Sequence, residues 1–131
     1  MNVVPALPDP LRVLIVDDHE VVRLGVRHLL QHIGRALEVA EAADLDAARR
    51  ALADRRFDLL LLDLALGDEF ALQALPRLRE EAAGARIIVL TSLAEELYAE
   101  RALKAGADGF VMKTELAATL LDAVNAVLCG E

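Results

Sequence analysis

Four short and almost uninterrupted apolar runs limit what this chain can fold into more than any other feature of the sequence. They occupy residues 12–16, 59–63, 86–90 and 109–112. A strand with both faces covered has this appearance, so each run is predicted to be a buried strand. The second run alone would also suit a helix, but its brevity favours a strand. Residues 37–42 alternate apolar and polar side chains, which predicts an edge strand with one face in water.

Segments with helical periodicity separate these strands, and apolar residues recur on one face of each. The residues that mark the five helices are Val22, Val26, Leu29, Leu30 and Ile33; Ala47, Ala51 and Leu52; Leu72, Leu75 and Leu78; Leu97, Arg101, Ala102 and Ala105; and the apolar positions of residues 115–128. Asp44 and Thr114 are expected to cap the second and fifth helices, and Gly106 to end the fourth. Pro76 either kinks the third helix or lies in its first turn.

The alternation of strand and helix predicts an α/β fold, with an open five-stranded parallel sheet and helices on both faces. In such a sheet the functional site lies at the carboxyl ends of the strands, near the switch in strand order. Polar residues gather at these predicted ends. They are Asp17 and Asp18 after the first strand, Asp63 at the end of the third, Thr91 and Ser92 after the fourth, and Lys113 after the fifth.

Three carboxylates, a hydroxyl and an ammonium group are therefore expected to converge on one small volume. Carboxylates packed together repel one another, and a divalent cation relieves that repulsion. Oxygen ligands with water left in the coordination shell suit Mg²⁺. A metal beside Lys113 stabilises a phosphoryl group, and an aspartate can accept that group as a nucleophile. The constellation predicts phosphoryl transfer to a carboxylate.

Composition argues against several other functions. The formal net charge is −8 and aromatic residues make up only 3% of the chain, so direct contact of this domain with nucleic acid is not expected. No apolar run approaches the ~18 residues of a membrane span, and the first ten residues lack the basic start of a signal peptide. The single Cys129 cannot form an internal disulfide. A cytoplasmic protein without membrane contact is expected.

Four segments of the chain resemble the receiver domains of bacterial response regulators. They are Val-Asp-Asp-His at 16–19, Leu-Asp-Leu at 62–64, Leu-Thr-Ser at 90–92 and Ala-Gly-Ala-Asp-Gly-Phe-Val-Met-Lys at 105–113. The resemblance implies a CheY-like, flavodoxin-like (βα)5 fold with strand order 2-1-3-4-5. It covers residues 11–129 as the receiver domain, preceded by a disordered leader at 1–10. Residues 130–131 are interpreted as the start of a linker or a C-terminal tail.

The resemblance implies a role for each acidic residue. Asp63 resembles the phosphoacceptor, which receives its phosphoryl group from a sensor histidine kinase. Asp18 and Asp63 would bind Mg²⁺ directly, Asp17 would act mainly through water, and Ala65 would lend its backbone carbonyl. Such a domain is no enzyme in the usual sense, since it catalyses only its own Mg²⁺-dependent phosphorylation and dephosphorylation.

The same resemblance assigns the remaining site residues. Thr91 and Lys113 would hold the phosphoryl oxygens. Phe110 matches the aromatic residue that moves together with Thr91 when the domain switches. His19 after the acidic pair, and Thr114 rather than proline after Lys113, are typical of the NarL/FixJ (LuxR-type) branch.

That branch normally carries a helix-turn-helix DNA-binding domain after the receiver, so we expect an excised receiver rather than a stand-alone one. The loop after Asp63 departs from the family, because Gly67 replaces the usual proline and Ala71 the usual glycine. Two alternative functions fit the residues less well. A haloacid-dehalogenase-type phosphatase would need an aspartate where Ala65 stands, and a pseudo-receiver would not need the complete site.

Two further expectations concern signalling. On the last helix an outer apolar stripe that includes Leu121 and Leu128 is expected to form a homodimer or to dock an output domain. The resemblance to receiver domains implies that Ala65 and Leu93 flank the path of the hydrolytic water, and neither side chain can hydrogen-bond a water. We therefore expect slow loss of the phosphoryl group.

Overall fold

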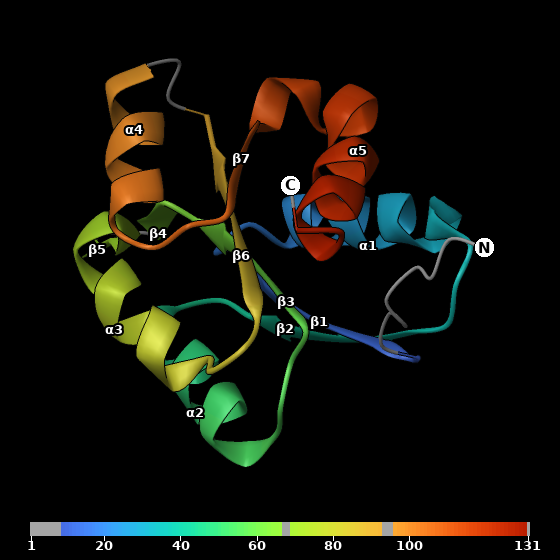
Figure 1. Cartoon of the computed structure of the whole chain (residues 1–131), viewed down its shortest axis with the longest axis horizontal. Coiled ribbons are helices and arrows are strands. Elements are labelled where there is room, and N and C mark those ends of the chain that lie inside the picture. The colour runs from blue at the N-terminus through green and yellow to red at the C-terminus, as the bar shows by residue number, and fades with distance from the viewer. Residues whose placement is uncertain (1–8, 67–68, 93–95, 131) are drawn as a thin grey trace.

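The computed structural model describes residues 9–66, 69–92 and 96–130 of the chain. The main strands are β1 (Leu11–Val16), β2 (Leu37–Ala42), β3 (Leu59–Asp63), β6 (Arg86–Thr91) and β7 (Gly109–Met112). The helices are α1 (Glu20–Leu30), α2 (Leu45–Asp54), α3 (Leu75–Glu81), α4 (Glu96–Lys104) and α5 (Leu116–Leu128). Figure 1 shows how these elements alternate along the chain, as the sequence predicts.

The five main strands form one parallel sheet in the order β2-β1-β3-β6-β7. Counted along the chain, this is the predicted order 2-1-3-4-5. The labels skip two numbers because the two-residue strands β4 (Ala65–Leu66) and β5 (Glu69–Phe70) pair with each other in a separate antiparallel hairpin. That hairpin, directly after the central strand, was not predicted.

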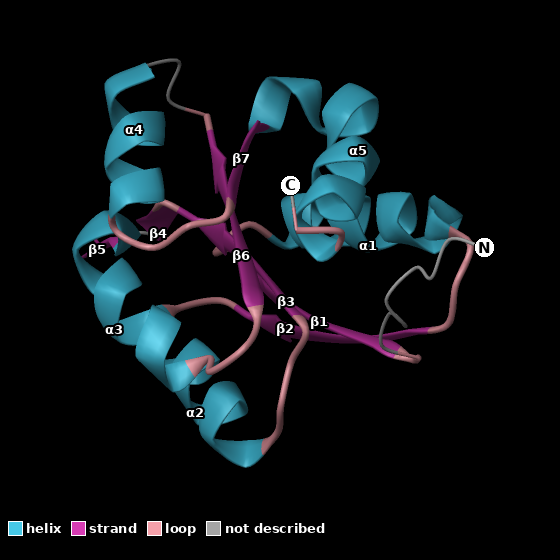
Figure 2. Cartoon of the chain, in the orientation of Figure 1, coloured by secondary structure: helices cyan, strands magenta, loops and turns pink. Residues whose placement is uncertain are grey.

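Helices cover both faces of the sheet: α1 and α5 lie on one side, and α2, α3 and α4 on the other (Figures 1 and 2). Successive residues of β1 point to opposite sides. Leu14 and Val16 join the core beneath α2, α3 and α4, whereas Val13 and Ile15 join the core beneath α1 and α5. This two-sided burial explains why the strands have continuous apolar sequences.

Most of the predicted helix boundaries are confirmed. The Asp44 side chain accepts a hydrogen bond from the backbone N–H of Ala47 at 2.7 Å and so caps α2. Gly106 has a φ of +121° after α4. Its N–H donates to the Leu103 carbonyl, and the N–H of Ala107 donates to that of Ala102, which is the hydrogen-bond pattern of a Schellman motif.

The start of α3 decides between the two places expected for Pro76, and the start of α5 differs from the prediction. Pro76 lies in the first turn of α3 rather than at a kink. Thr114 does not cap α5, because the chain continues from β7 into a 3₁₀ turn at Lys113–Glu115, and the α-helix begins only at Leu116. Thr114 therefore lies inside a tight turn in which its side chain makes no capping bond.

A close approach at the start of β7 fixes the position of α5 against the sheet. A Cβ atom added to Gly109 would lie 3.1 Å from Cγ1 of Val127 and 3.4 Å from Cγ1 of Ile88. The absence of a side chain thus lets α5 pack close to the strand that leads to Lys113. None of the helices in the described ranges is long and apolar enough to cross a membrane.

Candidate functional site

Asp17, Asp63 and Lys113 meet at the carboxyl ends of the sheet. Asp17 follows β1 and Asp63 ends β3, and these two strands are neighbours. Both carboxylates are buried, with 0% and 2% of the residue exposed. Lys113 follows β7, and its Nζ lies 2.9 Å from Oδ2 of Asp17 and 2.9 Å from Oδ2 of Asp63. The sequence prediction that these three groups converge is confirmed by this arrangement.

Backbone hydrogen bonds continue past the strand ends and hold the two aspartates. The N–H of Asp17 donates to the Ala42 carbonyl at 3.0 Å, and the N–H of Leu64 donates to the Leu90 carbonyl at 3.1 Å. The N–H of Ala65 donates to Oδ1 of Asp63 at 3.1 Å. The carboxylates are therefore fixed by the sheet itself rather than by a mobile loop.

Burial and neighbouring charges oppose each other at this site. Burial raises the pKa of the Asp63 carboxyl above its ordinary value. Its contact with Lys113 lowers that pKa, and the negative charge of Asp17 raises it further. Burial alone would lower the pKa of Lys113, but its contacts with Asp17 and Asp63 outweigh burial, and the pKa is raised. Lys113 is thus held in its ammonium form between two carboxylates.

Asp18 and His19 extend the cluster toward solvent. Nδ1 of His19 lies 3.0 Å from Oδ1 of Asp18 and 3.2 Å from Oδ1 of Asp17. The backbone N–H of His19 also donates to Oδ1 of Asp17 at 2.8 Å. His19 stands at the N-cap of α1, where its own side chain makes no capping bond. Asp17 therefore holds the residue that precedes α1, rather than an N–H of the first turn of that helix.

The remaining predicted residues lie near this cluster or border it. Thr91 ends β6, is 1% exposed and stands opposite Met112 in the sheet, next to Lys113. Ala65 is exposed at the start of the hairpin after Asp63. Phe110 is partly buried against the core on the α4 side and pairs with Val89.

The departures from the family in the loop after Asp63 are partly visible. Ala71 is fully buried, and its N–H donates to the Leu64 carbonyl at 2.7 Å. The chain at this position therefore closes back on the end of β3. Gly67 and Leu93 lie outside the described residues.

The donor set suits a divalent cation. Ligand atoms of Asp17, Asp18, His19 and Asp63 all lie within 4.8 Å of one another. Three carboxylates carry more negative charge than the single ammonium group of Lys113 neutralises, and burial makes that excess costly. Hard divalent cations take carboxylate oxygens of this kind. The side chains present therefore fit a metal ion.

His19 is the member of this group whose place among the carboxylates was not predicted from the sequence. Its position after the aspartate pair served only to indicate the branch of the family. Its backbone contact with Asp17 turns the ring toward the carboxylates. The sequence did contain a signal for this placement, namely a histidine directly after two aspartates at the end of a strand. The turn from β1 into α1 brings such a histidine close to both aspartates.

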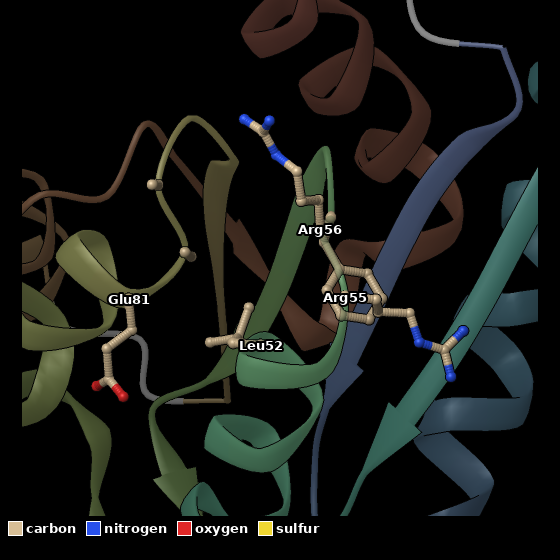
Figure 3. A pocket seen from close by; sticks show the side chains of 7 residues that line it. Leu52, Arg55, Arg56 and Glu81 are labelled. Carbon is tan, nitrogen blue, oxygen red and sulfur yellow. The ribbon is translucent and has the colours of Figure 1, made fainter.

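A hollow lies at the opposite end of the sheet from the carboxylate cluster, between the C-terminal ends of α2 and α3 (Figure 3). It has a volume of about 110 Å³ and is lined by Leu52, Arg55, Arg56, Phe57, Glu81, Ala82 and Ala83. The Arg55 guanidinium stacks 5.7 Å from the centre of the Phe57 ring. This hollow is separate from the carboxylate cluster, so it plays no part in the predicted chemistry.

Comparison with known sequences defines the class of protein. The sequence model of the response regulator receiver domain matches residues 13–125. This range covers most of the chain, which therefore belongs to that family. The chain is a receiver domain of a two-component response regulator.

The relatives place it among the NarL/LuxR-type receivers. It is 33% identical over 121 residues to the response regulator protein VraR of Staphylococcus aureus, which covers 92% of this chain and 58% of VraR. The chain thus spans about three fifths of that relative. A two-component response regulator of the LuxR family from Aurantimonas sp. SI85-9A1 is 34% identical, with a TM-score of 0.82, and the match covers 92% of this chain and 86% of that one.

A third relative bears on the chemistry of the family. It is a response regulator from Burkholderia pseudomallei whose crystal structure contains a phosphorylated aspartic acid, a calcium ion and citrate. Its identity to this chain is 30% and the TM-score is 0.78, over 90% of this chain and 68% of that one. An aspartyl phosphate and a divalent cation therefore occur together in a protein of this fold.

Proposed function

We propose that a sensor histidine kinase phosphorylates this receiver on Asp63, and that the modified domain switches a DNA-binding domain in the full-length protein. The observation that carries the proposal is the place of Asp63. It ends the central strand, is buried, and has one carboxylate oxygen 2.9 Å from the ammonium group of Lys113. A buried nucleophile beside a fixed cation suits transfer of a negatively charged phosphoryl group.

In the proposed step an oxygen of the Asp63 carboxylate forms a bond to phosphorus. The bond from phosphorus to the phosphohistidine nitrogen of the kinase breaks, and its electron pair returns to that nitrogen. The product is an acyl phosphate on Asp63. Lys113, already in contact with the carboxylate, and the hydroxyl group of Thr91 hold the phosphoryl oxygens.

Asp17, Asp18, Asp63 and the backbone carbonyl of Ala65 are proposed to hold Mg²⁺. When bound, the ion neutralises negative charge shared by the carboxylates and the incoming phosphoryl group. The domain catalyses only its own phosphorylation and dephosphorylation. The residues of this chain supply position, charge and exclusion of water.

Thr91 and Phe110 are proposed to carry the signal away from the site. Thr91 ends β6, and Phe110 lies on the neighbouring strand β7, packed against the same core as Tyr98 of α4. Movement of Thr91 toward a phosphoryl group would free space on the α4 side of the sheet. A partner that binds the α4 side of the sheet would therefore detect phosphorylation of Asp63.

The proposed partners are the kinase, a C-terminal DNA-binding domain and a second copy of the chain. Leu121 and Leu128 of α5 are both partly buried, and Leu128 packs against the core shared with α1. Leu121 is therefore the stronger candidate for a homodimer contact. We place the protein in the cytoplasm, where the kinase would present its phosphohistidine, and assign no nucleic-acid or membrane contact to this domain.

The test is phosphorylation by a small donor. Purified wild-type protein incubated with acetyl phosphate and Mg²⁺ should gain the mass of one phosphoryl group, and Asp63→Asn should not. Asp54→Asn is the matched control, because Asp54 is an exposed carboxylate at the end of α2, away from the site. Incorporation by Asp63→Asn at the wild-type level would contradict the assignment.

A further inference from the structure

We infer that His19 is a metal ligand, so that the site is a mixed carboxylate–imidazole site that prefers a first-row transition ion to Mg²⁺. The inference rests on the proposed metal site and names the class of ion that it selects. Its basis is the side-chain arrangement at the start of α1. There an imidazole nitrogen lies among the same carboxylates that are proposed to hold the metal.

The distances place the imidazole within the ligand cluster. Nδ1 of His19 is 3.0 Å from a carboxylate oxygen of Asp18 and 3.2 Å from one of Asp17. With Asp63 included, the ligand atoms all fall within 4.8 Å of one another. The ring thus shares one ion-sized volume with three carboxylates.

The backbone holds His19 in this position. Its N–H donates to Oδ1 of Asp17 at 2.8 Å, and its carbonyl accepts a hydrogen bond from the N–H of Arg23 at 3.1 Å, which opens α1. The Arg23 side chain also donates to the Asp17 carbonyl. The turn from β1 into α1 is therefore fixed on both sides of the imidazole. The ring itself is 65% exposed and contributes little to the core.

The chemistry of the donors decides which ion benefits. Mg²⁺ is a hard ion that keeps oxygen ligands and several waters, so an added nitrogen gains it little. Co²⁺, Ni²⁺ and Zn²⁺ bind imidazole well, and their affinity for sites with nitrogen and oxygen donors exceeds that of the earlier divalent ions. A site with one imidazole and three carboxylates should therefore discriminate between these ions through His19.

The two other histidines of the chain must be removed before the inference is tested. His28 of α1 and His32 lie four residues apart, with ring centroids 5.4 Å apart. Two exposed imidazoles at this spacing can bind transition ions on their own. The reference protein for the test is therefore the double variant His28→Ala, His32→Ala.

The experiment adds His19→Ala to that reference protein and titrates both with Co²⁺ and with Mg²⁺. Co²⁺ binding is followed by its visible absorption, which changes when a nitrogen ligand is lost, and both ions by calorimetry. Removal of a ligand should weaken Co²⁺ binding by about tenfold or more. Mg²⁺ binding should change by less than about twofold, since its ligands are oxygens.

The outcomes separate the inference from the proposed function. If Co²⁺ affinity and absorption are unchanged in the His19→Ala protein while Mg²⁺ still binds and Asp63 is still phosphorylated, His19 is not a ligand and the proposed function stands. If Mg²⁺ affinity falls as much as Co²⁺ affinity, His19 acts on the site without discriminating, which also overturns the inference. If neither ion binds the reference protein, the proposed metal site fails together with it.

Discussion

Asp63 and Asp108 are both carboxylates at the ends of strands, but their surroundings differ. Asp108, directly before β7, has one oxygen 3.0 Å from the guanidinium of Arg79 and accepts a hydrogen bond from the N–H of Ile87 at 2.8 Å on the other. Asp63 must share the single ammonium group of Lys113 with Asp17. At the amino end of the sheet, Asp108 thus links α3 to β6. At the carboxyl end, Asp17 and Asp63 lie close together.

The difference teaches where stability and chemistry are located in this fold. A partly buried carboxylate such as Asp108, which meets a guanidinium and a backbone N–H, stabilises the folded state. A buried carboxylate beside another one lowers stability until a cation or a modification relieves the repulsion. The first arrangement is suited to structure and the second to a ligand-dependent switch.

The largest expected effect tests the structural side of this comparison. Asp108→Ala should lower the free energy of unfolding by about 3 kcal/mol, because it leaves the N–H of Ile87 without its side-chain acceptor and Arg79 without its carboxylate. Denaturant unfolding measures the change. Asp54→Ala, on an exposed helix end, is the control and should change stability little. Equal effects of the two substitutions would break the comparison.

The next effect concerns the crowded carboxylates. Mg²⁺ at a hundred times its dissociation constant should stabilise the wild-type protein by about 2.7 kcal/mol. Asp18→Asn should raise metal-free stability by about 0.5 kcal/mol, since one of three mutually repelling charges is gone, and should reduce the Mg²⁺ effect. Thermal unfolding with and without Mg²⁺ measures both. A wild-type melting temperature that ignores Mg²⁺ would count against the site.

Glu41 of β2 provides a third carboxylate for the comparison, and its charge is neutralised by Arg23 and Arg27. Its contact with Arg27 lowers its pKa, burial opposes this, and the contact with Arg23 lowers it further. The folded-state pKa therefore lies below the unfolded one. The contribution of Glu41 to stability is fully present above the unfolded pKa and is lost as the pH falls through the folded pKa.

Glu41→Gln should therefore cost about 1 kcal/mol at neutral pH. The difference in the free energy of unfolding between wild type and variant should close in acid, as the pH falls below the ordinary glutamate pKa of 4.5. Urea unfolding at a series of pH values measures this gap. A gap that is constant from pH 7 to acid would show that charge is not its cause.

The smallest effect sharpens the chemical side of the comparison, because it concerns how long a phosphoryl group would stay on Asp63. The double variant Ala65→Asn, Leu93→Glu adds polar groups beside the expected path of water and should speed loss of the phosphoryl group several-fold. Decay of phosphorylated protein after removal of the donor measures the rate. An unchanged or slower decay would show that these positions do not control access of water.

The sequence predicted the sheet well because burial on both faces leaves an unmistakable apolar run, as at Leu59–Asp63. It also placed Asp63 and Lys113 at one edge, since parallel strands present their carboxyl ends together. It failed at Thr114, where a 3₁₀ turn replaced the expected cap. Such turns are decided by where β7 delivers the chain, which no local pattern encodes.

The hairpin β4–β5 and the placement of His19 were missed for a related reason. Two-residue strands are too short to leave a period in the sequence. The contacts of His19 arise from the angle at which α1 leaves β1, a property of the folded sheet. Long elements could thus be predicted from periodicity, whereas the details of the site depend on tertiary geometry.

Gly109 has a consequence for how this protein tolerates mutation. It lies outside the carboxylate cluster and does not need a positive φ, yet an added Cβ would press on Val127 and Ile88. Even alanine would require those side chains to give way, and larger residues would push α5 outward. In a survey of every single substitution, Gly109 should therefore tolerate few replacements although it lies outside the site. That intolerance would reflect the close packing of α5 on the sheet rather than a role in phosphorylation.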